Sequence, residues 1–384
     1  MDFRKTDEQE LLLESMRELF APGDWENYYQ ECDRDKKLPL KAIQVAVDNG
    51  FSKLGIPEEL GGIEVDLLTV CLVAEQASAL GFPAGAFVWP SFPTEVDEML
   101  AFGSKEQIKA TTEHAMKGFR PFSLGFTEPQ AGSDSNAITS TATRKNGKVY
   151  INGHKTFNSS GDVAPYMLCL VRDFKSDKPS KDMSMWHVPL NAPGVTAKPL
   201  NKIGNNVMNC CEVYLENVEI EEKDLVGVEG NGFSQLMKNF EIERLITCAH
   251  NLGMACCAYE DAARYAGQRV QFGQPIGSFQ LIQEKLCNMK IKIENMRHWV
   301  YQTAWKKDNG LPISTDAALA KVFTARSAFE VIDDAMQIMG GIGYTHDCRV
   351  SRLWRDQRVL RIGAGTDEIM IHIAGRALVK EASK

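Results

Sequence analysis

One acidic residue in the C-terminal half of the chain lies where a charge needs an explanation. In a helix, which turns by about 100° per residue, Glu243 falls on a mostly apolar stripe with Phe233, Leu236, Phe240 and Thr247. A buried carboxylate is strongly unfavourable unless it is paired or protonated. Two interpretations follow: a buried ion pair with an arginine of a neighbouring helix, which periodicity alone favours, or a general acid or base.

Two segments in the middle of the chain have the composition of a ligand site. Small and hydroxyl residues in Thr127–Asp134 would let backbone N–H groups approach an anion such as a pyrophosphate. In Asn152–Ser159, Phe157 and two hydroxyl residues directly after a predicted strand could hold a flat heterocycle. Each segment also has a simpler interpretation: an ordinary Gly-Ser turn for the first, and a core phenylalanine for the second.

Three glycine-containing segments at predicted helix ends could contact an anion. The first, Gln268–Gly277, is predicted to end a helix at Gly273, and Arg269 is placed to reach carbonyls or an anion. The second, Gln337–Tyr344, ends another helix in a glycine run that permits close backbone approach. The third, Gly363–Glu368, opens the last helix, where free N–H groups favour anions.

Several other kinds of site are disfavoured by the sequence. It contains no G-x-G-x-x-G after a strand and no G-x-x-x-x-G-K-[ST], which argues against Rossmann and P-loop nucleotide sites. The seven histidines show no H-x-x-x-H or H-x-x-E-H pairing and the ten cysteines no C-x-x-C, so no metal site is predicted. A net charge of -8 argues against a nucleic-acid-binding surface.

The expected location is the cytoplasm. The N-terminal residues Met1–Lys5 are polar and lead into an amphipathic pattern, so no signal peptide is predicted. No apolar run approaches the roughly 18 residues of a membrane span. The cysteines are scattered and follow no disulfide framework, which indicates a reducing compartment with mostly buried thiols.

The periodicity divides the chain of 384 residues into three regions. Residues 1–120 show helical periodicity and are predicted to form an α-helical domain without an obvious catalytic cluster. Residues 121–228 contain short β-branched or alternating segments, and Asn146-Gly147 between two of them is a two-residue hairpin signal. This region is predicted to be a small antiparallel β-barrel or sandwich.

Residues 229–384 are predicted to form a helical bundle. The long helical segments cover roughly residues 233–270, 278–308, 313–340 and 364–381. The segment Arg355-Asp-Gln-Arg358 is interpreted as a salt-bridge lattice between helices or subunits rather than a site. The expected fold class is therefore α+β and mainly α, with a β domain between two helical regions.

Taken in order, these motifs resemble those of the acyl-CoA dehydrogenases. The shared motifs are Thr127-Glu-Pro-x-Ala-Gly-Ser-Asp134, Gly153-x-Lys155, Arg269-x-x-Phe272-Gly273, Gln337-x-x-Gly-Gly341 and Gly365-Thr366. The resemblance covers essentially the whole chain, including Pro57–Gly62. Within this family the chain looks most like bacterial enzymes of anaerobic metabolism, such as crotonobetainyl-CoA reductase and related fatty acyl-CoA dehydrogenases.

The resemblance implies an N-terminal helical domain, a β domain and a C-terminal four-helix bundle, assembled as a homotetramer. It also implies non-covalent FAD, an acyl-CoA or enoyl-CoA substrate, and electron exchange with an electron-transfer flavoprotein. The residues that would hold the flavin or its pyrophosphate on one subunit are Leu124, Phe126, Thr127, Ser133, Phe157 and Ser159. Those that would clasp and complete the adenine end of FAD bound to a neighbouring subunit are Arg269, Phe272, Gln280, Gln337, Gly340, Gly341, Thr366 and Glu368.

Two departures from the family pattern matter. Gln130 replaces the glycine that usually follows Glu-Pro in the first motif, so it must tolerate or alter that turn. Many members carry the catalytic glutamate directly before the Gly-Thr of the last helix, where this chain has Ala364. Other members carry the base on a bundle helix in a Leu-Glu-Arg-Leu segment, and Ile242–Leu245 matches that pattern. The resemblance therefore assigns the general base, or the acid in the reverse reaction, to Glu243.

The substrate would contact Ser133, Phe240, Arg244, Gly363 and Ala364. Gly363 and Ala364 remove bulk from a pocket wall where relatives have Tyr-Glu, which leaves room for a branched, trimethylammonium or aryl acyl group. Two further functions stay open on the sequence. One is an oxygen-using acyl-CoA oxidase or flavin monooxygenase, and the other is a non-enzymatic scaffold that binds acyl-CoA and flavin.

Overall fold

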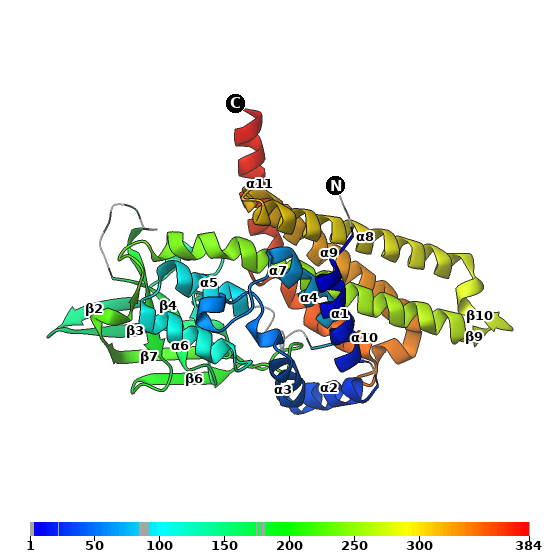
Figure 1. Cartoon of the computed structure of the whole chain (residues 1–384), viewed down its shortest axis with the longest axis horizontal. Coiled ribbons are helices and arrows are strands. Elements are labelled where there is room, and N and C mark those ends of the chain that lie inside the picture. The colour runs from blue at the N-terminus through cyan, green and yellow to red at the C-terminus, as the bar shows by residue number, and fades with distance from the viewer. Residues whose placement is uncertain are drawn as a thin grey trace.

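The computed structural model describes residues 4–21, 23–83, 92–173, 176, 178 and 181–383. A β-rich part lies at one end of the molecule and a bundle of long helices at the other, with shorter helices packed between and beneath them (Figure 1). Helix α7 (Gly232–Gln268) extends from the β-rich part to the far end of the bundle. The predicted order of helical, β and helical regions is thereby confirmed.

The N-terminal part is built from short helices whose starts are fixed by polar caps. Thr6 and Ser104 each form a capping box with a glutamine three residues later. Helix α2 buries Tyr29 and Cys32. The helices are α1 (Asp7–Leu19), α2 (Asp24–Asp35), α3 (Leu40–Asp48), α4 (Leu67–Ala79), α5 (Phe92–Phe102) and α6 (Lys105–Ala115).

The β-rich part is a mixed sheet with the strand order β6-β7-β3-β2-β4-β5-β8 and with β1 paired to β4. Most neighbours are antiparallel, but β1 and β2 both run parallel to β4, so the prediction of a purely antiparallel domain is wrong at these pairs. The reason is that the β2–β3 hairpin lies between β1 and β4 in the chain, so no tight turn joins them. The strands are β1 (Phe122–Gly125), β2 (Thr141–Lys145), β3 (Lys148–Ser159), β4 (Tyr166–Arg172), β5 (Met183–Pro189), β6 (Val195–Pro199), β7 (Cys210–Ile220) and β8 (Leu225–Val226).

Two local features of the sheet bear on the sequence predictions. Asn146 and Gly147, with φ of 53° and 75°, form the predicted two-residue hairpin between β2 and β3. Strand β3 does not end near Asn152 as expected but continues to Ser159 through two register shifts. A bulge inserts extra residues into one strand of a pair, which hides the strand's period-two pattern in the sequence.

The C-terminal part contains α7, α8 (Gln280–Asp308), α9 (Ser314–Met339), α10 (Arg349–Gln357) and α11 (Asp367–Ala382). Alanines and glycine on the packed faces let these helices approach closely. A Cβ added at Gly253 of α7 would lie 2.2 Å from the Glu75 carbonyl oxygen of α4. The shared core therefore fixes α7 against both the N-terminal helices and the bundle.

The end of α7 differs from the prediction. The helix stops at Gln268 rather than continuing to Gly273, and β9 (Val270–Gln271) and β10 (Gln274–Pro275) form a hairpin. Phe272 and Gly273, both at positive φ, make its two-residue turn, so Gly273 ends a hairpin turn rather than a helix. None of the described helices combines the length and apolar character that crossing a membrane requires.

The segment from Arg355 to Arg358 has the structural role that its charges indicated. Helix α10 was not predicted, and it presents Arg352 and Arg355 to α2, where they pair with Glu26 at 3.1 Å and Asp33 at 2.7 Å. The buried Asp356 accepts the backbone N–H of Asn205. The interpretation as a salt-bridge lattice between helices is confirmed.

Candidate active site

Glu243 lies in the first third of α7, half-buried. One turn earlier, Phe240 packs edge-on against Phe126, which follows β1, with 6.0 Å between the ring centroids. Among the described residues, no hydrogen bond or ion pair involves the Glu243 carboxylate. The ion pair with an arginine of a neighbouring helix, which periodicity favoured, is therefore not formed in this part of the chain.

Three positive charges nevertheless lie within electrostatic range of Glu243. Burial raises the pKa of the Glu243 carboxyl, whereas the charges of Arg120, Arg244 and Lys321 oppose that rise. Arg120 pairs instead with Glu95 of α5. Burial, reinforced by the charge of Glu243, raises the pKa of Glu95 to about 7 despite that pair. Glu243 is thus a carboxyl with a raised pKa and no direct partner in the described part of the chain.

The turn before α11 is held against α7 and α9 by two buried cations. Arg244, directly after Glu243, donates from Nε to the Ala364 carbonyl at 3.4 Å. Lys321 of α9 donates from Nζ to the Gly365 carbonyl at 2.6 Å. Both turn residues have positive φ, 52° for Ala364 and 93° for Gly365, so the backbone rather than a side chain faces these cations. The position where relatives carry a glutamate is therefore close to Glu243.

The predicted anion-binding loop is fixed by a buried ion pair. Glu128 accepts Lys155 Nζ at 2.8 Å and the backbone N–H groups of Thr139 and Ser140 at 2.7 and 3.0 Å. Burial alone would raise the pKa of Glu128, but Lys155 and these donors outweigh it and lower the pKa to about 2. Gln130 donates to Glu128 at 2.7 Å, so the departure from the family's glycine adds a bond to the network.

Strand β3 brings the second predicted segment beside this loop. The Thr156 backbone N–H donates to the Thr127 carbonyl at 2.8 Å, which joins the two segments directly. Phe157 lies at the register shift with φ of 58°, and 67% of its surface is exposed, so it is not a core residue. The hydroxyls of Thr127 and Ser159 make no hydrogen bond to another described residue.

These residues fit an aromatic ring system that carries a phosphate-bearing tail. Positive φ and exposure of the ring are both unfavourable for a phenylalanine, and an aromatic ring stacked on Phe157 would stabilise it in this position. The unpaired hydroxyls beside it, together with that of Ser133 in the exposed part of the loop, can donate to oxygens of a bound group. Leu124 and Phe126, both half-buried, add an apolar wall on the side of Phe240.

A second set of predicted cofactor residues lies elsewhere. Arg269 and Phe272 belong to the hairpin at the end of α7, roughly 40 Å of helix away from Glu243. Figure 1 shows this hairpin and the β sheet at opposite ends of the molecule. The remaining members are exposed near the hairpin and at the end of α9: Gln280, Gln337, Gly340 and Gly341. One bound dinucleotide cannot contact both sets within one chain.

Thr366 and Glu368 lie at the start of α11. The Thr366 hydroxyl accepts the Ile369 N–H at 3.2 Å and so caps the helix, while Glu368 is exposed. The buried Asp367 between them accepts Arg326 and Arg361 at 3.0 and 2.9 Å. Gly363 has space beside it, because an added Cβ would meet only the Val359 carbonyl at 3.7 Å.

Sequence reasoning missed Glu95, Arg120 and Lys321. The signal for Lys321 was the same as for Glu243, since it interrupts a buried alanine face of α9 at helical spacing. Glu95 likewise lies beside the buried Val96 and Met99 on α5. Arg120 gave no such signal, because it lies in a connection between a helix and a strand.

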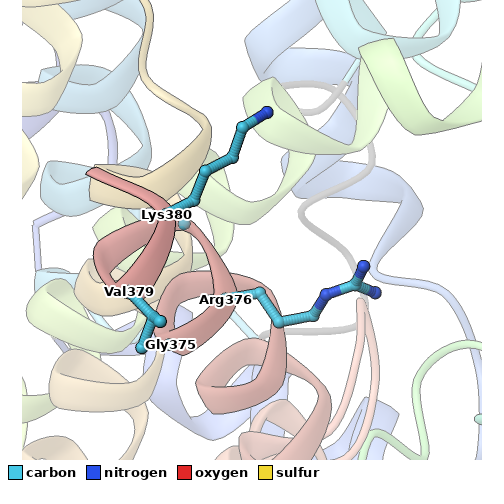
Figure 2. Close-up of a pocket in the computed structure, with 5 residues that line it drawn as sticks. Gly375, Arg376, Val379 and Lys380 are labelled. Atoms are coloured by element: carbon cyan, nitrogen blue, oxygen red, sulfur yellow. The ribbon is translucent and has the colours of Figure 1, made fainter. Parts of the chain in front are cut away.

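Two hollows of the described surface are lined by residues other than the predicted site residues. One lies along the exposed helix α11 and is lined by Gly375, Arg376, Ala377, Val379 and Lys380 (Figure 2). Another lies at the edge of the sheet between Gly161 and Tyr166. Across the described part of the chain, no group of histidine, cysteine, aspartate or glutamate side chains could hold a metal ion.

Comparison with known proteins covers all three parts of the chain. Residues 6–118 match the family model "Acyl-CoA dehydrogenase, N-terminal domain". Residues 123–218 match the model of the middle domain of the same family, and residues 230–379 match that of its C-terminal domain. The "Probable acyl-CoA dehydrogenase YdiO" of Escherichia coli strain K12 is 52% identical over 382 residues, which is 99% of each chain.

Solved structures show the same similarity. Butyryl-CoA dehydrogenase from Megasphaera elsdenii is 29% identical with a TM-score of 0.91 over 99% of this chain and 100% of that chain. A chain from a study of the electron transferring flavoprotein of Acidaminococcus fermentans is 30% identical, also with a TM-score of 0.91 over 99% and 100%. A glutaryl-coenzyme A dehydrogenase in complex with glutaryl-CoA is 27% identical with a TM-score of 0.89, over 99% and 97%.

Proposed function

The chain belongs to the acyl-CoA dehydrogenase family, and we propose that it interconverts an acyl-CoA and its α,β-enoyl-CoA with Glu243 as the proton-transfer group. One observation carries the assignment of Glu243. Its carboxyl has no direct partner among the described residues, has a raised pKa, and lies beside the turn where Ala364 replaces the more common glutamate. A carboxylate with a pKa near the working pH is suited to general base catalysis.

In the oxidative direction, ionised Glu243 would remove the α-proton of the thioester. In the reductive direction, protonated Glu243 would return that proton to the α-carbon. Phe126 and Phe240 form an apolar wall beside the carboxyl, which excludes water and favours proton transfer to carbon. The space at Gly363 and Ala364 would accept a bulky acyl group.

The cofactor of this reaction is proposed to be FAD, which when bound would accept the β-hydrogen as a hydride. Leu124, Phe126, Thr127, Ser133, Phe157 and Ser159 would hold its flavin and pyrophosphate. The residues that would serve the FAD of another copy of the chain are Arg269, Phe272, Gln280, Gln337, Gly340 and Gly341, with Thr366 and Glu368 completing that site. The separation of the hairpin residues Arg269 and Phe272 from Glu243 supports an oligomer, which we propose to be a homotetramer.

We further propose that an electron-transfer flavoprotein exchanges electrons with the enzyme. This rests on the family and on the relative from the Acidaminococcus fermentans study. Oxidation of the reduced enzyme by such a partner, but not by air, would distinguish a dehydrogenase from an oxidase. Rapid reoxidation by air would instead support an acyl-CoA oxidase.

The assignment of Glu243 is tested by anaerobic flavin reduction. Mixing the FAD-loaded protein with a series of acyl-CoA thioesters should bleach the flavin spectrum, and Glu243→Gln should slow bleaching by about 10²- to 10⁴-fold. Glu241→Gln is the matched control, because it removes a carboxylate two residues earlier on α7, about 200° around the helix, that the mechanism does not use. Equal bleaching rates for wild type and Glu243→Gln would remove Glu243 from the mechanism.

A further inference from the structure

Two carboxyl groups of α5 have buried oxygens without a hydrogen-bond partner among the described residues. Glu98 is 2% exposed, and in the described part of the chain neither of its carboxylate oxygens has such a partner. Glu95, three residues earlier, contacts Arg120 through Oε1, but its Oε2 is buried and unpaired. Residues three apart are neighbours on the surface of a helix, so these groups share one side of α5.

Their place in the fold connects them to the site. Helix α5 packs against α7, the charge of Glu243 raises the pKa of Glu95, and the charge of Arg120 lowers the pKa of both carboxyls. The core residue Met99 of α5 belongs to the same cluster as Phe126 and Phe240. The unpaired oxygens therefore lie on the helix that borders the proposed acyl site.

Buried polar groups without partners are costly, and native proteins retain few of them. A plain alkyl chain would leave these oxygens unpaired, because it has no donor and carries no charge. A hydrogen-bond donor on the substrate would satisfy them. A positive charge would compensate the two carboxylates, of which Glu95 alone has an arginine partner among the described residues.

Resting on the proposed function, we infer that Glu95 and Glu98 form a subsite for the ammonium group of an acyl-CoA whose acyl chain ends in an amine. The N–H donors would pair with Glu98 and with Oε2 of Glu95. Arg120 would keep Oε1 of Glu95 in place. The subsite thus favours a cationic acyl chain over an alkyl chain of the same length.

The charges around the subsite set its pH dependence. Burial raises the pKa of Glu98 to about 7, and burial together with Glu243 raises that of Glu95 to about 7 against the charge of Arg120. Burial also raises the pKa of Asp97, on another side of α5, to about 6 against the charge of Lys307. Ionised carboxylates bind an ammonium, so the preference for the amine should grow as the pH rises from 6 to 8.

The experiment compares acyl-CoA thioesters ending in an ammonium group with alkyl thioesters in which a methyl group replaces it. With the FAD-loaded wild type, a dye acceptor and chains of six to eight carbons, kcat/KM should be about tenfold higher for at least one amine. Equal or higher values for every alkyl partner would overturn the inference. No turnover and no flavin bleaching with any thioester would overturn the proposed function as well, which separates the two failures.

Variants test whether Glu95 and Glu98 cause the preference for the amine. Glu98→Gln should reduce the ratio of kcat/KM for the amine to kcat/KM for its alkyl partner toward unity, and Glu95→Gln should reduce this ratio in part. Glu113→Gln is the control that should leave the ratio unchanged, because it removes an exposed carboxylate of α6 that pairs with Lys109. A preference that survives in Glu98→Gln and Glu95→Gln, or that falls as the pH rises, would overturn the subsite.

Discussion

At Glu243, opposing influences act on a single carboxyl group. Burial raises its pKa, and the nearby charges of Arg120, Arg244 and Lys321 limit the rise. A low pKa keeps the carboxyl ionised but makes it a weak base, whereas a high pKa makes it a stronger base but leaves it mostly protonated. An intermediate pKa is therefore favourable for a general base. The rate of α-proton removal is therefore expected to increase with pH through the raised pKa, and the reverse reaction to decrease.

Lys321→Met is expected to shift this pH profile. The change removes one of the charges that lower the pKa of Glu243, so the acidic limb of the kcat/KM profile for dehydrogenation should move to higher pH. It also removes the bond to the Gly365 carbonyl. Lys292→Met is the control, since that lysine pairs with Glu330 on the surface. If the acidic limb of the kcat/KM profile does not move in Lys321→Met, the charge of Lys321 does not lower the pKa of Glu243.

Glu98→Gln is expected to stabilise the protein at alkaline pH. The folded-state pKa is raised from 4.5 to about 7, so the carboxyl destabilises the fold once it ionises, by on the order of 3 kcal/mol. The penalty is absent below pH 4.5 and complete above about pH 7. The midpoint of thermal unfolding of the variant should therefore exceed that of wild type at pH 8 but not at pH 5. A lower midpoint at pH 8 would show that the carboxylate has a stabilising partner.

At the scale of elements, the loop Thr127–Asp134 depends on a strand for its shape. Lys155 of β3 reaches Glu128 in the loop and the Leu170 carbonyl of β4 at 2.6 Å, so one ammonium ties three segments together. The loop can thus present its remaining backbone and hydroxyl groups outward. This arrangement explains why the Gly153-x-Lys155 motif accompanies a loop more than 20 residues earlier in the chain.

Lys155→Met should destabilise the fold and weaken retention of FAD. It leaves the Glu128 carboxylate buried without its ion-pair partner, which costs about 3–5 kcal/mol. Glu128 stabilises wild type above its unfolded pKa, near 4.5, and that contribution is lost as the pH falls toward 2. Urea unfolding at pH 7 and the flavin content of the purified protein measure both effects. Adding Glu128→Gln to the variant should restore part of the stability, and failure to do so would argue against an unpaired charge as the cause.

The sequence predicted these elements to different extents. Long periodic helices such as α8 and α9 and the Asn146-Gly147 hairpin were found, because each has a strong local pattern. The extension of β3 through its register shifts and the stop of α7 at Gln268 were not, because pairing with other segments determines them. For the candidate site, the helical period placed Glu243 on an inward stripe of α7, whereas the contact of Arg120 with Glu95 depends on how two distant segments pack.

At the scale of the whole molecule, the hairpin end of the bundle is unusually apolar for a surface. Phe272 is 94% exposed and Tyr344 85%, and Val270, Leu281 and Ile342 are also more than half exposed. Exposed apolar patches of this kind mark interaction sites. Since the same end carries Arg269 and Gln280, the patch agrees with a cofactor site completed by another copy of the chain.

Phe272→Asp is expected to reduce both oligomer size and FAD content. The charge would have to be buried against the other copy without a partner, which is unfavourable. Sedimentation velocity and the ratio of flavin to protein absorbance measure the two effects. Leu11→Asp provides the control, because Leu11 is a similarly exposed apolar residue on α1. Unchanged mass and flavin content in Phe272→Asp would place the subunit contact elsewhere.

The contacts of Arg244 and Lys321 with the Ala364-Gly365 turn have a consequence for how such proteins diverge. Both cations bind backbone carbonyls, so they hold the turn whatever side chain position 364 carries. With the proposed proton-transfer group on α7, residues 363 and 364 can change during evolution without altering the acid-base step. New acyl groups could then be recruited by mutations in the turn, while the chemistry is inherited unchanged on the helix.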